Sequence, residues 1–231
     1  MNGTSFLKPD LVVTWPMHLD YPLWRQQLKD HRDRFKSVII VFTNMNVGKD
    51  YRDFLIKAMD GNKVIFLHNY LTQGDWRNNS VNLALRNITS DWVFFTEQDF
   101  IFKPGLWDLV TEQMKEHKYI RAMVGDRVHP CCILVTRPLI EKTSKNFAVV
   151  KDMHDHFYVF ADELKEEKAY TIPEAYWYHY GSMSQNMYFL LTGQKITYEE
   201  EEFRRYLKKC LEVKVPMHKD FINLFKGYLD E

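Results

Sequence analysis

The chain has 231 residues, which is enough for one large domain or two small ones. Its 31 lysines and arginines balance its 31 aspartates and glutamates, which argues against a protein that binds nucleic acid through its charge. Hydrophobic residues make up 45% of the chain, and this excludes a disordered protein.

The cysteines and the apolar runs bear on where the protein works. Three cysteines, two of them adjacent, exclude a disulfide scaffold and fit a reducing compartment. Residues 1–10 have no apolar signal core, and the sequence has no run of about 18 apolar residues that could span a bilayer. We therefore expect a cytoplasmic protein without a transmembrane segment.

Short apolar segments alternate with amphipathic ones in the first half of the chain. The pattern predicts helices at residues 21–35, 51–59 and 81–88, and strands at residues 11–15, 38–43, 63–68 and 91–96. Apolar strands that alternate with helices are typical of a mainly parallel sheet covered by helices on both faces. Ligands bind such sheets beyond the carboxyl ends of the strands, so polar residues there are the first candidates for a site.

Two carboxylates follow the most apolar of these strands. Glu97 and Asp99 are two positions apart, so their side chains point the same way if strand geometry continues. Like charges that close repel each other unless a cation lies between them. Mg²⁺ or Mn²⁺, sharing its ligands with a substrate phosphate, would supply that cation. The alternative interpretation is an exposed acidic turn.

The second half of the chain is less regular. The pattern predicts a strand at residues 131–136, a short helix at 138–144 and an amphipathic helix at 157–164. Asp155 stands just before the last of these helices, where it would serve either as a helix cap or as a general base. His179 lies among aromatic residues, a setting in which a buried core histidine is commoner than a ligand.

The C-terminal part is predicted to be helical. Residues 197–200 resemble a capping box that opens a helix. Further on, an apolar stripe that includes Phe221 and Phe225 favours docking on the core, and contact with a partner or with a membrane surface is the alternative.

Three ordered segments resemble GT-A glycosyltransferases, especially the family 2-like inverting enzymes. Residues 82–99 resemble the Asn-x-Gly helix, the apolar strand and the Asp-x-Asp motif, and residues 131–147 resemble the strand and helix that end in Gly-Gly-Phe. Residues 154–181 follow the family order of acidic pair, helix, Pro-Glu-Ala strand and histidine. The resemblance implies an α/β GT-A fold: a catalytic domain at residues 1–190 and a helical C-terminal extension at 191–231 packed on it.

The resemblance implies a role for several residues. Glu97 and Asp99 take the places of the Asp-x-Asp motif, and His179 matches the late histidine, so these three would bind Mn²⁺ or Mg²⁺. Asp155 matches the second acid of the acidic pair, which is the general base of the family. The expected contacts with the nucleotide or its sugar come from Thr14, Pro16, Asn44, Asp75, Arg77 and Asn82, with Arg77 suited to bidentate pairing with phosphate.

The sequence departs from the family pattern at four places. Glu97 replaces the first aspartate of the motif, and Asn44 replaces an aspartate that follows the second strand. His154 replaces the first acid of the acidic pair, and residues 144–146 read Ser-Lys-Asn where two glycines are expected.

These observations predict a metal-dependent glycosyltransferase of the hexosyltransferase type. It would move a sugar from a UDP- or GDP-sugar to the hydroxyl of a glycan or another acceptor, with inversion. One alternative is a sugar nucleotidyltransferase, which is less favoured because residues 15–20 contain neither glycine nor a lysine or arginine. The other is a non-catalytic nucleotide-sugar binding protein, which the departures at Glu97 and His154 leave open.

Overall fold

The computed structural model describes residues 8–16, 19–43, 49–59, 64–69, 76–125, 127–147, 157–181, 183–196 and 198–230. Its strands are β1 (Asp10–Pro16), β2 (Val38–Thr43), β3 (Val64–His68), β4 (Trp92–Thr96), β5 (Phe100–Phe102), β6 (Tyr119–Val124), β7 (Arg127–Thr136), β8 (Ala169–Thr171) and β9 (Trp177–His179). Its α-helices are α1 (Pro22–His31), α2 (Lys49–Met59), α3 (Trp76–Leu85), α4 (Leu106–Gln113), α5 (Arg137–Lys142), α6 (Tyr158–Glu163), α7 (Met183–Thr192), α8 (Glu200–Glu212) and α9 (Lys219–Asp230). Two short 3-10 helices, η1 (Arg32–Arg34) and η2 (Glu174–Tyr176), complete the described elements.

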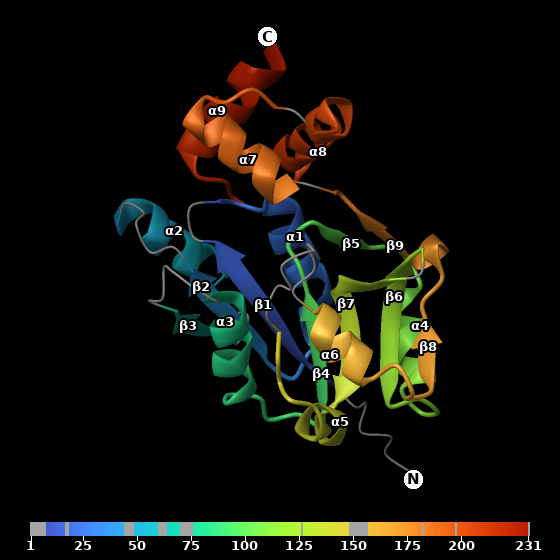
Figure 1. Cartoon of the computed structure of the whole chain (residues 1–231). Coiled ribbons are helices and arrows are strands. Elements are labelled where there is room, and N and C mark those ends of the chain that lie inside the picture. The colour runs from blue at the N-terminus through green and yellow to red at the C-terminus, as the bar shows by residue number, and fades with distance from the viewer. Residues whose placement is uncertain are drawn as a thin grey trace.

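Seven strands form one mixed sheet in the order β3-β2-β1-β4-β7-β6-β8 (Figure 1). The first four are parallel, β7 is antiparallel to both β4 and β6, and β8 is parallel to β6. Strands β5 and β9 form a separate antiparallel pair. The predicted mixed α/β sheet with its parallel half is therefore confirmed.

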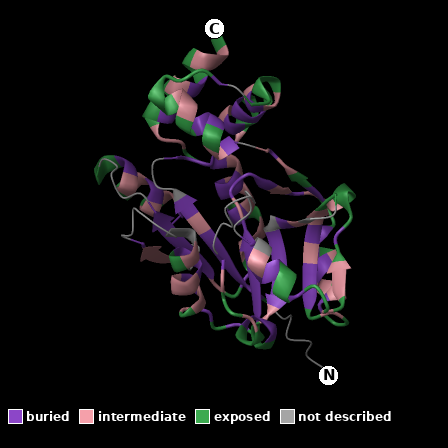
Figure 2. Ribbon diagram, viewed as in Figure 1, coloured by how far each residue is buried: buried purple, intermediate pink, exposed green. Residues whose placement is uncertain are grey.

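The strands are apolar because both faces of the sheet are covered. Every residue of β2 and of β4 is buried, as the purple strands in Figure 2 show. Successive side chains point to opposite faces, so Ile40 joins one core cluster while Ile39 and Val41 join the other. A one-sided sheet would have alternated polar with apolar residues instead.

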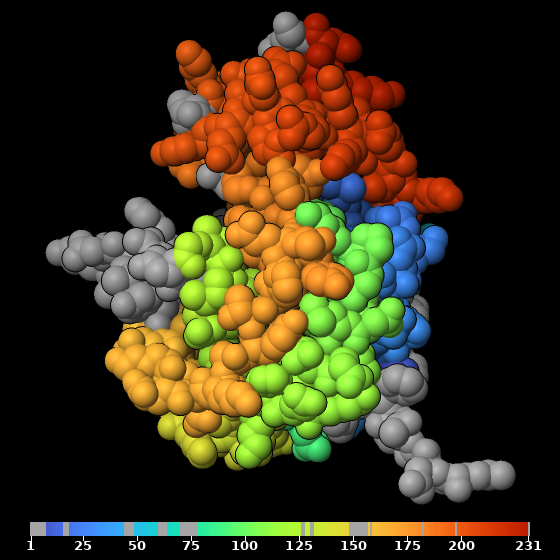
Figure 3. Space-filling view, turned by 90° about the vertical axis from the view of Figure 1, so that its right-hand side faces the viewer, coloured from blue at the N-terminus to red at the C-terminus, as the bar shows by residue number. Residues whose placement is uncertain are grey.

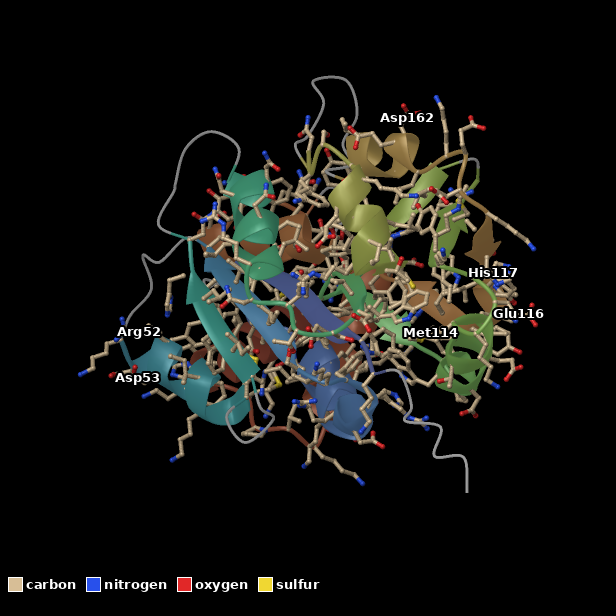
Figure 4. All side chains as sticks on the ribbon, turned by 90° about the horizontal axis from the view of Figure 1, so that it is seen from below. Arg52, Asp53, Met114, Glu116, His117 and Asp162 are labelled. Atoms are coloured by element: carbon tan, nitrogen blue, oxygen red, sulfur yellow. The ribbon has the colours of Figure 1, made fainter. Side chains whose placement is uncertain are left out.

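The helices divide between the two faces. Helices α3, α5 and α6 contribute buried side chains to the cluster that contains Ile39, whereas α1, α2 and α4 pack on the side of Ile40. Figure 4 shows the two layers from below, with Arg52 and Asp53 of α2 and Asp162 of α6 at the outer edge. The polar faces of these helices thus point away from the sheet.

The C-terminal helices dock on the core, as the apolar stripe predicted. Phe221 and Phe225 of α9 are buried in the same cluster as α1 and α2, and the rings of Phe221 and Tyr51 are 5.2 Å apart. Helices α7, α8 and α9 form a group beyond the carboxyl end of β1 (Figure 1). Among the described residues, none of the helices is long and apolar enough to cross a bilayer. The predicted boundary between a catalytic domain at residues 1–190 and an extension at 191–231 stays a prediction.

Several local expectations are wrong in detail. The helix predicted at residues 81–88 is α3, which runs from Trp76 to Leu85; the pattern missed its first half because residues 77–80 are polar and show no apolar period. The predicted capping box does not open α8, since the N-cap is Glu199 and makes no side-chain cap bond. The segment Pro-Glu-Ala is not a strand: η2 begins at Glu174, and β9 follows at Trp177.

Candidate active site

The turn between β4 and β5 carries the acidic motif. Strand β4 ends at Thr96, and Gln98 and Asp99 form a turn before β5 begins at Phe100. The expectation that strand geometry continues through residues 97–99 is therefore wrong. The turn is held from both sides, because the Gln98 side chain donates a hydrogen bond to the carbonyl of Thr14 and the amide of Tyr180 donates to the carbonyl of Asp99 over 3.0 Å.

Strand β9 brings His179 to this turn. Phe100 pairs with His179 in the antiparallel β5–β9 ladder, so His179 lies beside Asp99, which precedes Phe100. Glu97, Asp99 and His179 each offer one ligand atom, and these atoms all lie within 4.8 Å of one another. The structure thus brings together the three residues that the sequence assigned to a metal.

Asp99 and His179 face each other in a buried setting. Their Oδ1 and Nε2 atoms are 3.2 Å apart, and the side chains are 9% and 24% exposed. Within the described part of the chain neither atom has a hydrogen-bond partner beyond the other. Buried polar atoms without partners are costly, and a cation between the two side chains would satisfy both.

The charge around the cluster is negative. Burial on its own would lower the pKa of His179, but the carboxylates of Asp99, Glu97 and Glu199 together raise it. His129 of β7 stacks edge-on against His179, with ring centroids 4.3 Å apart, and its pKa is lowered to about 4 by burial and by the neighbouring imidazole. His129 is therefore neutral at pH 7 and adds no positive charge beside the carboxylates.

The donor set fits a divalent cation. Carboxylate oxygens are ligands that both Mg²⁺ and Mn²⁺ accept. The imidazole nitrogen of His179 favours Mn²⁺, because nitrogen is a poor ligand for the harder Mg²⁺ ion. Three protein ligands also leave coordination positions open for the oxygens of a substrate.

The predicted nucleotide-binding residues are placed unevenly. Thr14 lies near the carboxyl end of β1, where its carbonyl accepts the hydrogen bond from Gln98, and Pro16 is the last residue of the same strand. The backbone of Arg77 lies in the first turn of α3. Asn44, Asp75 and the proposed base Asp155 lie outside the described residues.

Asn82 lines a different cavity from the one beside His179. It is on α3, and its amide donates to the carbonyl and the side chain of Asn78, each over 3.0 Å. It lines a cavity of about 410 Å³ together with Arg86 and Lys145. The structure does not join this cavity to the cluster of Glu97, Asp99 and His179, so a nucleotide contact of Asn82 stays a prediction.

A second cavity opens beside His179. It has a volume of about 920 Å³ and lies where β9 meets the start of α8, on the face shown in Figure 3. Its lining comprises Lys103, Val124, Glu174, Trp177, Tyr178, His179, Gly181, Glu199, Glu200, Glu201, Glu202 and Arg205. We call this cavity the β9 cleft.

The sequence missed three residues around the cluster. Gln98 anchors the acidic turn, His129 packs on His179, and Glu199 contributes negative potential at His179. Gln98 stands inside the motif and was overlooked because it is no metal ligand. His129 belongs to no motif and Glu199 is assigned only to the predicted capping box, so the folding of β7 and α8 onto β9 is what brings them near.

Solved glycosyltransferase structures share the fold of this chain. The chain is similar to the mannosyltransferase PcManGT from Pyrobaculum calidifontis, solved with GDP-Man and Mn²⁺: the TM-score is 0.56 at 14% identity, over 98% of this chain and 69% of that one. It is also similar to TarS from S. aureus (TM-score 0.55, 13% identity, 96% of this chain and 50% of that one). GlyE from Streptococcus pneumoniae TIGR4 gives 0.51 at 10% identity, over 96% and 63%.

The likeness lies in the fold and not in the sequence. The chain matches no protein-family model and no curated protein by sequence. It spans half the length of the TarS chain and about two thirds of PcManGT. The sheet order and the near-complete coverage of this chain by these structures show that it has the GT-A fold of nucleotide-sugar-dependent transferases.

Proposed function

We propose that the protein is a metal-dependent glycosyltransferase that moves a sugar from a nucleotide-diphosphate donor to a hydroxyl acceptor. The observation that carries this proposal is the convergence of Glu97, Asp99 and His179 at the carboxyl end of β4. In the order β3-β2-β1-β4 the strand sequence reverses beside β1, which is where open α/β sheets bind their ligands. A metal site at that point lies where a nucleotide diphosphate would lie.

Asp99, Glu97 and His179 would hold the cation, and Mn²⁺ fits this donor set best. When bound, the cation would neutralise negative charge on the diphosphate leaving group. PcManGT was solved with GDP-Man and Mn²⁺, and TarS with UDP-GlcNAc, which supports a GDP- or UDP-sugar as the donor here. A hexose as the transferred sugar is part of the same proposal.

Asp155 is the proposed general base. Its carboxylate would take the proton of the acceptor hydroxyl while that oxygen forms a bond to the anomeric carbon of the sugar. The bond from this carbon to the diphosphate oxygen breaks on the opposite side, and the electron pair leaves with the nucleoside diphosphate. Attack opposite the leaving group inverts the configuration. The cytoplasmic location stays a prediction.

A panel of nucleotide-sugars incubated with the purified protein and Mn²⁺ tests this proposal. Release of a free nucleoside diphosphate supports the glycosyltransferase. Exchange of labelled pyrophosphate into the nucleotide-sugar would indicate a nucleotidyltransferase instead. Binding of a nucleotide-sugar without turnover would indicate a non-catalytic binding protein. The three outcomes differ in product and are told apart in one set of reactions.

A further inference from the structure

The β9 cleft borders the metal-ligand cluster at His179. His179 belongs both to the cluster and to the lining of the cleft, whereas Glu97 and Asp99 line only the cluster side. The nucleotide is expected at the carboxyl ends of β1 and β4. If the protein is a glycosyltransferase, as proposed, it also needs a site for the acceptor, and the β9 cleft is the candidate.

Tyr178 presents an aromatic ring in this cleft. It is the middle residue of β9 and is 37% exposed. Its hydroxyl donates a hydrogen bond to Glu202, and its ring meets that of Tyr180 edge-on with centroids 4.8 Å apart. The ammonium of Lys103 lies 5.9 Å from the ring centroid. A ring fixed by these contacts loses little freedom when a ligand stacks on it.

Carboxylates dominate the charge of the cleft. Five glutamates line it, against the cations Lys103 and Arg205 and the imidazole of His179, and one of the five, Glu200, is paired with Arg204 over 3.4 Å. Arg205 is already paired with Glu202 over 2.6 Å, and Lys103 donates to the backbone carbonyl of Glu174. The cleft therefore repels phosphate and carboxylate groups, and its carboxylate oxygens can accept hydrogen bonds from hydroxyl or ammonium donors.

Glu199 extends this lining toward the cluster. Its carboxylate lies against Gly181, where an added Cβ would meet Oε2 at 3.2 Å. The negative charge of the same carboxylate helps to raise the pKa of His179. The cleft thus has a hydrogen-bond acceptor that acts on His179, the residue it shares with the proposed metal site.

We propose that the β9 cleft is the acceptor site and that it takes a saccharide without an anionic group, stacked by its apolar face on the ring of Tyr178. An aromatic ring flanked by hydrogen-bond acceptors matches a pyranose, which has an apolar C–H face and a rim of hydroxyl donors. Acceptors that carry phosphate would meet the negative charge of the glutamates. This inference rests on the proposed function, because only a glycosyltransferase would use the bound saccharide as its acceptor.

Saturation-transfer NMR of the full chain with simple saccharides tests the proposal without any nucleotide or metal. The probes are the methyl glycosides of glucose, mannose, galactose and N-acetylglucosamine, with glucosamine and glucose 1-phosphate. We expect at least one uncharged or amino sugar to bind and glucose 1-phosphate not to bind. Tyr178→Ala should weaken the binding by about tenfold, the scale of one aromatic contact.

Two further variants separate stacking from a structural role. Tyr178→Phe keeps the ring but loses the hydrogen bond to Glu202, so it should bind within about threefold of the unsubstituted protein, since one such bond contributes about 1 kcal/mol or less. Tyr188→Ala removes an exposed ring of α7 that does not line the cleft, and it should change nothing. Melting curves of all variants show whether each has folded.

The proposal is overturned if no saccharide binds, if glucose 1-phosphate binds as well as the neutral sugars, or if folded Tyr178→Ala binds as tightly as the unsubstituted protein. Equal loss in Tyr178→Phe and Tyr178→Ala also overturns it, because the hydroxyl and not the ring would then matter. Failure of the nucleotide-sugar panel alongside normal saccharide binding would instead count against the glycosyltransferase.

Discussion

Asp99 and His179 come from opposite halves of the chain, yet their Oδ1 and Nε2 atoms lie 3.2 Å apart. The pairing of β5 with β9 produces this relationship, because it sets His179 opposite Phe100 and so beside Asp99. The amide of Tyr180 reinforces it by donating to the carbonyl of Asp99. The short ladder of β5 and β9 thus assembles the proposed metal site beyond the carboxyl end of β4.

Replacing Asp99 tests the metal site most directly. We expect Asp99→Ala to abolish Mn²⁺-dependent release of nucleoside diphosphate and to weaken Mn²⁺ binding by at least about a hundredfold, because a buried charged ligand is lost. Calorimetric titration with Mn²⁺ and assays with and without EDTA measure both effects.

The control for this variant is Asp108→Ala, which removes a largely exposed carboxylate of α4. It should leave metal binding and turnover unchanged. Full activity of the unsubstituted protein in the presence of EDTA would rule out the metal role of Glu97, Asp99 and His179.

Asp155→Asn tests the proposed base. An amide cannot take the proton of the acceptor hydroxyl, so transfer should fall by about a hundredfold or more while the Kd for the nucleotide-sugar changes little. Asp152→Asn, in the same segment, serves as the matched control and should retain transfer. If Asp155→Asn loses donor binding and transfer to the same extent, Asp155 has a structural role instead.

We expect the protein to lose much of its stability when the buried ion pair of Asp20 and Arg25 is broken. Arg25 makes two hydrogen bonds to the carboxylate, at 2.9 and 3.0 Å, and a third to the carbonyl of Pro216 at 2.7 Å. Arg25→Met should lower the free energy of unfolding by about 3–5 kcal/mol, because Asp20 would stay buried without its counter-charge. Urea denaturation measures the change.

Two comparisons sharpen this prediction. Arg34→Met breaks an exposed pair with Asp108 at 4.0 Å and should cost no more than about 1 kcal/mol. The double variant Asp20→Leu, Arg25→Met should recover much of the loss, since no buried charge remains. A single variant Arg25→Met as stable as the unsubstituted protein would show that the pair contributes nothing to stability.

Lys145 has a backbone conformation that favours glycine. Its φ of 55° lies in the left-handed region, and it belongs to residues 144–146, where the sequence resemblance leads one to expect two glycines. Lys145→Gly should keep the hydrogen bonds of its amide and carbonyl and raise the free energy of unfolding by about 0.5–1 kcal/mol. Lys29→Gly, on an exposed position of α1, should lower it by about 0.5–1 kcal/mol. Thermal and urea denaturation distinguish the two signs.

The sequence alone determined the parallel half of the fold. Residues 38–41 are β-branched and apolar, Phe42 and Thr43 follow them, and these six residues form β2 within the predicted bounds because both faces of that strand are buried. Glu97 and Asp99 were recognised because charge directly after an apolar strand is a local signal. The family resemblance added His179, for which the residues themselves favoured a place in the core.

Only the tertiary structure decided which side chains meet. His129 and Glu199 come near His179 through the packing of β7 and of the start of α8 against β9. No local pattern encodes these contacts, because each depends on strands and helices that are distant in the chain. Periodicity reports how one segment buries its own apolar face, whereas the shape and charge of a cleft depend on which segments pack against one another.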